Sequence, residues 1–308
     1  MELCIDFGGT EIKLAVIDGH RVLASGSIPV QGGPSDLAAA AVEARRLLER
    51  TGPAEAVGIA VPGVVEPGTG RMLHANAKYD FLRDLDLKAW SPAEFGVSAA
   101  VENDARAALI GETSSGSSAG TRDAVLVTLG TGIGTAVLME GMPLRGRTGH
   151  AGILGGHLTV DLDGPVCPCG NIGCGEALAS TWALDASTGS ATQHPGSATQ
   201  AGRVTMAEVF AGEAHREIRE RYLRVWGAVV TSLVHSYDPA IVILSGGILR
   251  AGDAVSAPIE AYVRAHLWPS LTPPRFVVPP EPELSVARGL SVLARAAHSH
   301  TATPQEEQ

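Results

Sequence analysis

The sequence predicts an α/β protein of two domains, and three observations lead to this prediction. The chain has 308 residues, more than a single hydrophobic core usually organises. Hydrophobic residues make up 45% of the chain but aromatic residues only 4%, so the core must consist mainly of Ala, Val, Leu and Ile, as in layers of buried strands and amphipathic helices. Finally, an apolar strand, a glycine turn and a second strand occur near the start of each half.

The first half is expected to open as a β-meander and then to alternate helix and strand. Strands are predicted over 2–7, 12–18, 21–29, 56–61 and 97–101, and helices over 34–50 and 105–112. The first helix carries Ala and Leu with Glu and Arg at helical spacing and ends at Gly52 and Pro53. A Ser- and Gly-rich stretch from Thr113 to Gly120 is a natural boundary, so the first domain is expected to cover 1–115.

The second half repeats the opening pattern and is expected to form a domain over 116–283. Strands are predicted over 123–129, 135–140 and 241–244, and helices over 213–236 and 284–298. The polar, Gly- and Ser-rich stretch 186–203 is expected to be exposed. The short polar tail, 299–308, is expected to be disordered.

Charge and hydropathy exclude two classes of partner. The formal net charge is −10, whereas a nucleic-acid-binding surface needs a basic patch. The chain contains no run of 18 or more apolar residues, so no membrane span is expected. The chain enters its first strand directly, without a basic leader and an apolar segment, so a cytoplasmic location is predicted. Cys4 falls within that apolar strand and is expected to belong to the core.

A histidine and three cysteines predict a structural zinc site. His157, Cys167, Cys169 and Cys174 lie within 18 residues of one another. One imidazole and three thiolates form the tetrahedral nitrogen and sulfur set that zinc takes in closed sites. Unrelated buried thiols or a disulfide are the alternatives, and the reducing interior of a cell disfavours the disulfide. A metal loop over 157–176 would also hold Glu176 in a fixed position.

Three glycine turns are candidates for holding a nucleotide. The first turn is in the string D-F-G-G-T-E-I-K at 6–13. Asp6 stands at the end of a strand, where it can face a metal ion. The glycines that follow can expose backbone N–H groups to phosphate oxygens. One such turn is weak evidence, since hairpins use glycine for geometric reasons. The second turn, at 130–134, and the Ser-Gly-Gly string at 245–247 strengthen the hypothesis. Neither the P-loop pattern nor G-x-G-x-x-G before a long helix occurs, so those two modes of phosphate binding do not fit.

These motifs together resemble the ROK family of sugar kinases and sugar-responsive repressors, which has the actin/hexokinase-like ATPase fold. The resemblance extends over nearly the whole chain. It rests on D-F-G-G-T-E-I-K at 6–13, V-P-G at 61–63, E-N-D-A at 102–105, G-T-G-I-G at 130–134, the zinc loop, and D-P followed by I-V-I-L-S-G-G within 238–247. It implies two domains with an active-site cleft between them, and a C-terminal helix, 284–298, that returns to pack on the first domain.

The resemblance also implies an activity, the ATP-dependent phosphorylation of a hexose at its 6-hydroxyl, with Mg²⁺, a structural Zn²⁺ and a homodimer. Asp104 corresponds to the catalytic base, although Asn103 or Asp104 could instead only cap the helix that follows. The residues implied to bind sugar are Asn76, Asn103, Asp104, His157 and Glu176. Those implied to bind the nucleotide are Asp6, Gly8, Gly9, Thr10, Lys13, Gly130, Thr131, Gly132, Gly134, Gly246 and Gly247.

The chain departs from the family pattern at Leu154. Family kinases usually carry a sugar-binding glutamate three residues before the histidine that corresponds to His157. A sugar hydroxyl that faces leucine would lose a charge-assisted hydrogen bond, at a cost of about 1–3 kcal/mol. We therefore expect selectivity near C1–C3 of the sugar to differ from that of a plain glucokinase. His150 could compensate in part, and Asp80, Arg83 and Asp84 are further candidates near Asn76.

Several functions remain open from the sequence. Glucose or a related sugar such as an amino sugar is the first expectation, and an N-acetylhexosamine or fructose kinase of the same family is the alternative. A sugar-responsive repressor would carry a DNA-binding module before the first strand, which here begins at residue 2. A non-catalytic sugar-binding protein is disfavoured by the retained Asp6, Lys13 and Asp104. Polyphosphate could replace ATP as donor, but no basic tract favours it.

Overall fold

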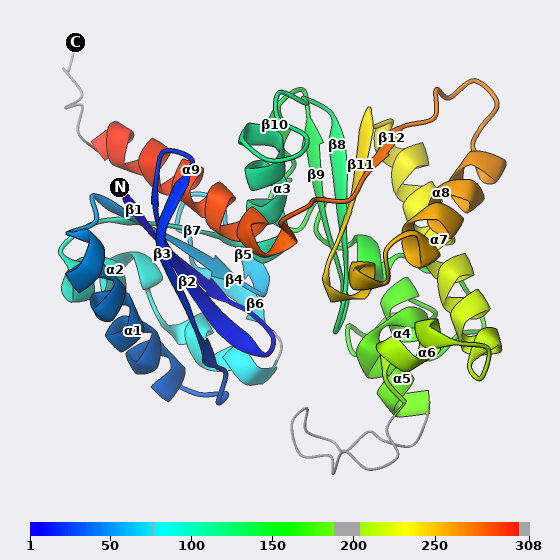
Figure 1. Ribbon diagram of the computed structural model, residues 1–308, viewed down its shortest axis with the longest axis horizontal. Helices are drawn as coiled ribbons and strands as arrows, with labels where there is room; N and C mark the ends of the chain where they lie inside the picture. Colours follow the sequence, from blue (N-terminus) through cyan, green and yellow to red (C-terminus); the bar gives the residue numbers. More distant parts are fainter. Residues whose placement is uncertain (76, 188–203, 302–308) are drawn as a thin grey trace. The chain divides into compact units, whose positions relative to one another are not determined.

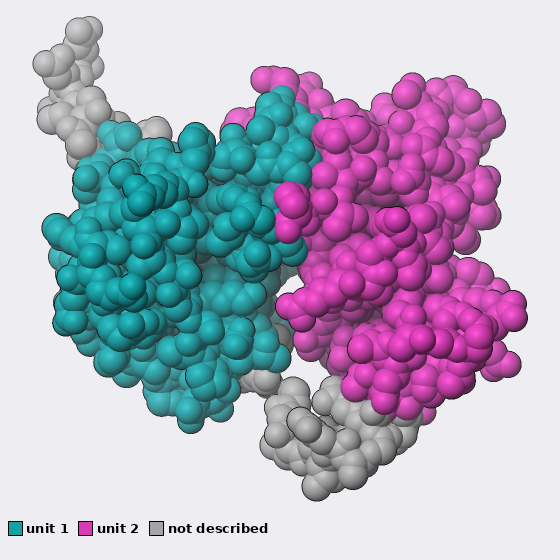
Figure 2. All heavy atoms as spheres, viewed as in Figure 1, with its two compact units in different colours: residues 1–121, 143–151, 281–308 teal, residues 122–142, 152–280 magenta. Residues whose placement is uncertain are grey.

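The structure is a computed structural model that describes residues 1–75, 77–187 and 204–301. The chain forms two compact units (Figure 2), of which unit 1 comprises residues 1–121, 143–151 and 281–308. Unit 2 comprises residues 122–142 and 152–280. Asn76, most of the stretch predicted to be exposed, and residues 302–308 lie outside the described residues. Within the described part of the chain, no helix is long and apolar enough to cross a membrane.

Unit 1 is built on a five-stranded mixed sheet in the order β3-β2-β1-β4-β7 (Figure 1). The strands are β1 (Glu2–Phe7), β2 (Glu11–Asp18), β3 (Arg21–Pro29), β4 (Ala56–Val61) and β7 (Ala99–Asn103). Strand β1 is antiparallel to β2 and parallel to β4, and β4 is parallel to β7. Every residue of β4 is buried, as the unbroken apolar run of a central strand predicts. The carboxyl ends of β1, β4 and β7 therefore meet at one edge of the sheet.

Helices cover both faces of this sheet because its side chains alternate between them. Leu3, Ile5 and Phe7 of β1 join the core on the side of α1 (Ser35–Thr51), whereas Cys4 packs with Leu290 of α9 (Pro282–Thr301). The remaining elements of unit 1 are β5 (Gly63–Val65), β6 (Met72–Ala75), η1 (Ala77–Asp84), α2 (Leu87–Phe95) and α3 (Asp104–Ser114).

Helix α9 packs closely on β4 and α3. A Cβ atom at Gly58 would lie 2.6 Å from the backbone oxygen of Leu290, and one at Gly289 would lie 1.8 Å from that of Ala107. Ser291 donates a hydrogen bond of 2.7 Å to the buried carboxylate of Glu2, which ties the helix to the first strand. The helix continues to Thr301, so the prediction of disorder from Ser299 is wrong for residues 299–301.

Unit 2 contains a second five-stranded sheet in the order β10-β9-β8-β11-β12 (Figure 1). The strands are β8 (Ala124–Leu129), β9 (Ile133–Met139), β10 (Met142–Pro143), β11 (Ile241–Ser245) and β12 (Arg275–Val277). The helices are η2 (Gly155–His157), α4 (Gly175–Ala179), α5 (Thr181–Ser187), α6 (Met206–Ala211), α7 (Arg216–Tyr237), η3 (Gly247–Ala251) and α8 (Asp253–His266). Strands β8 and β11 are parallel, so their carboxyl ends also share an edge.

Segment 143–151 belongs to unit 1, although the residues on both sides of it belong to unit 2. Arg106 of α3, which is fully buried, donates hydrogen bonds to the carbonyl oxygens of Gly149 and Ala151 at 3.0 and 3.2 Å. The same guanidinium pairs with the buried carboxylate of Glu102 at 2.7 Å, and Arg145 contacts the other oxygen of that carboxylate. A buried ion pair therefore fastens this segment to the junction of β7 and α3.

We expect Arg106→Met to destabilise the protein by about 3–5 kcal/mol, because it leaves the buried Glu102 carboxylate with an incomplete set of partners. Denaturant-induced unfolding measures this change. Arg264→Met is the matched control, since Arg264 pairs with Glu260 at the same separation of four residues but both side chains are exposed. The control should lose less than about 1 kcal/mol. An equal loss of unfolding free energy in the two variants would show that burial of the pair between Glu102 and Arg106 contributes nothing to stability.

Candidate active site

The first glycine turn joins β1 to β2 and is anchored from within unit 1. The Gly8 N–H donates to the carbonyl oxygens of Asp6 and Glu11, both at 3.1 Å, and a Cβ at Gly8 would lie 2.7 Å from the Glu11 oxygen. The buried Tyr79 donates its hydroxyl to the Gly8 carbonyl at 2.7 Å and packs edge-on against Phe7. Gly9 and Thr10 are exposed at the tip of the turn. The turn is thus fixed at Gly8 and open to solvent beyond it.

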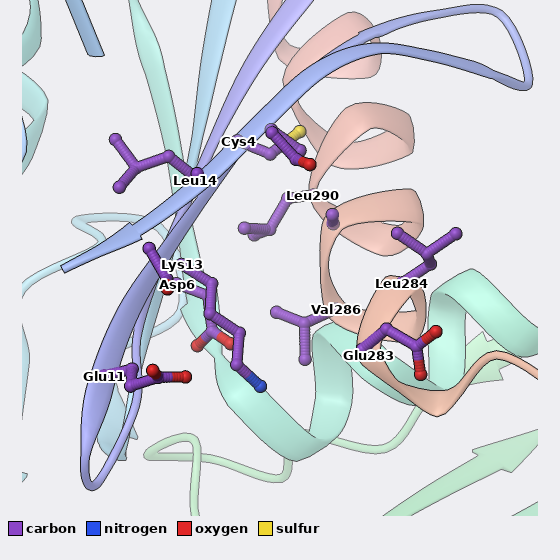
Figure 3. A pocket seen from close by; sticks show the side chains of 14 residues that line it. Cys4, Asp6, Glu11, Lys13, Leu14, Glu283, Leu284, Val286 and Leu290 are labelled. Atoms are coloured by element: carbon purple, nitrogen blue, oxygen red, sulfur yellow. The ribbon is translucent and has the colours of Figure 1, made fainter. Parts of the chain in front are cut away.

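A cavity of about 340 Å³ lies between this hairpin and α9 (Figure 3). Asp6 and Lys13 are directly paired across β1 and β2, so both side chains leave the same face of the sheet. Figure 3 shows them at the cavity together with Glu11 and Glu283, with Leu290 among the apolar side chains that line it. The predicted nucleotide residues Asp6 and Lys13 are therefore adjacent in space.

The Asp6 carboxylate is suited to a cation. Its Oδ1 is inaccessible to solvent and has no hydrogen-bond partner among the described residues. Burial and the nearby charge of Asp104 raise the pKa of Asp6 to about 7, and Lys13 opposes this shift. An unpaired carboxylate oxygen of this kind fits Mg²⁺, which binds proteins through one or two carboxylates and otherwise keeps water or phosphate ligands.

The junction of β7 and α3 places Asp104 at the same edge of the sheet as Asp6. Asn103 is the N-cap of α3, and its Oδ1 accepts the Arg106 N–H at 3.1 Å. Its Nδ2 donates to the Gly63 carbonyl at 3.1 Å and to the Asp104 Oδ1 at 2.9 Å. Asn103 therefore caps α3, and both groups of its side-chain amide have partners within unit 1. Its contact with a sugar stays a prediction.

Asp104 is held by one of its oxygens only. Its Oδ1 accepts the Ala105 N–H at 2.8 Å as well as the Asn103 amide, whereas no donor among the described residues bonds Oδ2. Burial raises the pKa of Asp104, and these hydrogen bonds lower it in part. A carboxylate with one fixed and one unpaired oxygen is suited to accept a proton from a substrate.

Sequence reasoning missed the support behind this junction. Glu102 accepts the Asn103 backbone N–H at 2.9 Å through the oxygen that also pairs with Arg106. Glu102 is in β7 and Arg106 is in α3, so the helical i,i+4 rule did not indicate their contact. Nothing in the sequence indicated Arg145, which lies 43 residues away.

The four predicted zinc ligands of unit 2 come together. A ring nitrogen of His157 and the Sγ atoms of Cys167, Cys169 and Cys174 all lie within 4.8 Å of one another. The Sγ atoms of Cys169 and Cys174 are 3.7 Å apart, and Nδ1 of His157 is 3.6 Å from Sγ of Cys167. Tetrahedral zinc with its usual bond lengths requires separations of about 3.8 and 3.6 Å, whereas a disulfide requires about 2.05 Å. The ligand set therefore fits zinc and not a disulfide.

The backbone of the zinc loop explains how these ligands converge. Gly173 has a φ of +66°, and a Cβ there would lie 1.5 Å from the Asp161 carbonyl oxygen, so only glycine fits. The Gly170 N–H donates to the Cys167 carbonyl at 2.9 Å, which closes the turn between two ligands. Nδ1 of His157 is turned toward the Cys167 thiol, and the contact of its other ring nitrogen with a sugar stays a prediction.

The second glycine turn, between β8 and β9, contacts the helix that follows the zinc loop. The Ile133 N–H donates to Oε2 of Glu176 in α4 at 2.8 Å. The Gly130 carbonyl accepts the backbone N–H and the hydroxyl of Thr181, at 3.1 and 2.9 Å. The predicted sugar carboxylate and the predicted phosphate turn thus share a hydrogen bond.

The third glycine pair follows β11, next to the second turn. Gly246 has a φ of +97°, and a Cβ there would lie 2.4 Å from the Leu129 carbonyl oxygen. Gly247 has no atom within 4 Å of a Cβ position, so its surroundings within the described structure are open. The carboxyl ends of parallel strands are where α/β sheets bind ligands. Gly246 is therefore needed for packing, and Gly247 is the one that offers space.

The structure also places Leu154, the residue that departs from the family pattern. This residue is 43% exposed and lies just before η2, which ends at His157. The core of unit 2 does not require an apolar group there. His150 belongs to unit 1, where its Nδ1 lies 3.0 Å from the Thr148 carbonyl oxygen.

Comparison with known proteins identifies the family. The ROK family model matches residues 2–297. A glucokinase of Halalkalibacterium halodurans is 30% identical over 286 residues, which cover 86% of this chain and 86% of that protein. A xylose repressor of Bacillus spizizenii is 28% identical over 220 residues, which cover 70% of this chain and 54% of the repressor.

A solved structure agrees with this result. The ROK family glucokinase from Streptomyces griseus, in complex with glucose and AMPPNP, is similar with a TM-score of 0.81 at 28% identity. The match covers 96% of this chain and 99% of that one. The predicted family resemblance and the predicted fold are both confirmed. The chain belongs to the ROK family and has the two-domain actin/hexokinase-like ATPase fold.

Proposed function

We propose that the protein is an ATP-dependent kinase that phosphorylates the 6-hydroxyl of a hexose, either glucose or a glucose-related sugar. The observation that carries this proposal is the buried Asp104, whose Oδ1 is fixed by Ala105 and Asn103 while Oδ2 remains unpaired among the described residues. The glucokinases among its relatives support a sugar as acceptor.

In the proposed reaction, Asp104 accepts the proton of the sugar 6-hydroxyl. The sugar oxygen forms a bond to the γ-phosphorus while the bond from that phosphorus to the bridging oxygen of ADP breaks. Mg²⁺, held by Asp6, would neutralise charge on the phosphates. Lys13 and the N–H groups of the glycine turns would bind the phosphate oxygens. His157, Glu176, Asn76 and Asn103 are proposed to orient the sugar.

The relatives also include a repressor, so a sugar-responsive regulator is the second candidate. Asp6, Lys13 and Asp104, which a sensor of sugar alone would not need, favour the kinase. A coupled assay of ADP release, run over hexoses, amino hexoses and N-acetyl hexoses, tests the assignment. Sugar-dependent ADP release supports it. Sugar binding without ADP release, by a protein that also binds ATP, would favour the regulator.

Leu154 is proposed to set the sugar preference. We expect an analogue of glucose altered at C1, C2 or C3 to have a higher kcat/KM than glucose itself. Leu154→Glu should then shift preference toward glucose by about tenfold to a hundredfold, because the carboxylate restores an acceptor for the hydroxyls that leucine leaves unpaired. Steady-state kinetics of both proteins with glucose and the best analogue measure this shift.

Leu154→Gln is the matched control, since it adds a polar group of similar size without the charge. Its shift toward glucose should be smaller than that of Leu154→Glu. Because Leu154 is exposed, neither variant should unfold the protein. A preference for glucose in the unsubstituted enzyme, unchanged in both variants, would remove Leu154 from the determinants of specificity.

A further inference from the structure

We propose that Glu176 positions the turn at 130–134, so that the carboxylate expected to bind sugar also determines the affinity for the nucleotide. This inference rests on the proposed kinase function. The Oε2 atom of Glu176 accepts the Ile133 N–H at 2.8 Å, across 43 residues of sequence. Glu176 is thereby a positioning residue for the phosphate turn as well as a candidate sugar ligand.

The space beside Gly132 provides a second observation. A Cβ atom at Gly132 would lie 2.4 Å from Oε2 of Glu176 and 3.0 Å from its Cδ. Gly132 does not have a positive φ, so the turn itself does not demand glycine there. The absence of a side chain at Gly132 is what lets the carboxylate reach the Ile133 N–H.

The start of the turn is held by α5. Thr181 donates its N–H and its hydroxyl to the Gly130 carbonyl, and the Trp182 N–H lies 3.3 Å from the Thr131 carbonyl oxygen. These bonds fix the carbonyl groups of the first two residues. Ile133 begins β9 and pairs with Leu129 of β8. Glu176 is the only described side chain that accepts an N–H of the turn, so it adds a side-chain restraint at the end that leads into β9.

One carboxylate can serve both roles because its two oxygens differ. Oε2 is bonded to Ile133, whereas no donor among the described residues bonds Oε1. Cys174, a zinc ligand two residues earlier, and the N–H of Gly175, which donates to the Leu158 carbonyl at 3.0 Å, fix the start of α4. The zinc loop thereby sets the position of the phosphate turn through Glu176.

The test is the affinity for the AMPPNP–Mg²⁺ complex in the absence of any sugar, measured by calorimetry. Glu176→Ala should weaken binding roughly tenfold, the effect of losing a hydrogen bond to a charged group. Glu176→Gln keeps an acceptor for the Ile133 N–H and should stay within about threefold of the unsubstituted protein. Glu213→Ala, which removes an exposed carboxylate of unit 2, is the control and should have no effect.

Gly132→Ala provides an independent test. The new methyl group should displace the flexible end of Glu176 and weaken AMPPNP–Mg²⁺ binding by a similar factor. In the Glu176→Ala background the methyl group has space, so the double variant should bind no more weakly than Glu176→Ala alone. Full additivity of the two losses would overturn the contact as the cause.

The outcomes separate this inference from the kinase assignment. If AMPPNP–Mg²⁺ binds and Glu176→Ala leaves its affinity unchanged or increases it, the positioning role is overturned while the kinase remains. If the unsubstituted protein with zinc bound fails to bind AMPPNP–Mg²⁺ at all, both proposals are overturned. Weaker sugar binding alone, without a change in nucleotide affinity, would restrict Glu176 to the sugar.

Discussion

Asp104→Asn is expected to lower kcat by about 10²- to 10⁴-fold while sugar binding survives, because only the proton acceptor is lost. The asparagine Oδ1 can still accept the Ala105 N–H and the Asn103 amide, so the local geometry is preserved. Steady-state kinetics measure kcat, and calorimetry measures the sugar affinity. Activity within tenfold of the unsubstituted enzyme would assign the base to another residue.

Stability measurements distinguish a loss of catalysis from a loss of folded protein in this variant. Burial raises the folded-state pKa of Asp104 above its unfolded value. At pH values between these two pKa values, the folded protein therefore binds more protons than the unfolded protein. The contribution of Asp104 to stability therefore falls as pH rises through that window. At pH values above the folded-state pKa of Asp104, Asp104→Asn should be at least as stable as the unsubstituted protein. Thermal unfolding at several pH values would show this. A less stable variant at high pH would contradict the proposed cause of the inactivity.

Cys169→Ser is expected to release a tightly bound zinc ion and to disorder the zinc loop. The unsubstituted protein should contain about one zinc per chain, and structural zinc sites contribute on the order of 10 kcal/mol to the folding of their loops. Since His157 and Glu176 flank the cysteines, the sugar KM should rise along with the loss of stability. Elemental analysis and thermal unfolding measure the two effects.

Cys4→Ala is the matched control for the zinc prediction. Cys4 is buried in unit 1, and burial raises the pKa of its thiol well above the usual range, so it is a poor metal ligand. The control should keep its zinc. Stoichiometric zinc in Cys169→Ser, or loss of zinc in Cys4→Ala, would contradict the ligand set of His157, Cys167, Cys169 and Cys174.

The parts of the fold that the sequence predicted are those with local causes. The turns at Gly8 and Gly130, the end of α1 at Gly52 and the close spacing of the zinc ligands all depend on neighbours in the chain. Strand ends were predicted less well. Strand β7 runs over Ala99–Asn103 rather than 97–101, because pairing with Val57–Val61 of β4 decides its length.

The parts that the sequence did not predict depend on distant residues. Segment 143–151 joins unit 1 through Arg106, and no local pattern marks that contact. The bond from the Asn103 amide to the Gly63 carbonyl joins residues 40 positions apart and was not predicted. The hydrogen bond between Glu176 and Ile133 joins residues 43 positions apart and was not predicted either. Tertiary packing determines all three.

The position of α9 has a consequence for biosynthesis. The face of β1, β2 and β4 formed by Cys4, Ala15 and Ala60 is covered by Leu290 of α9. All of unit 2, residues 122–142 and 152–280, leaves the ribosome between these strands and that helix. At usual translation rates this apolar face stays uncovered for roughly 10–50 s, long enough for a chaperone to bind it. Unit 2 is therefore complete before unit 1, although most of unit 1 is synthesised earlier.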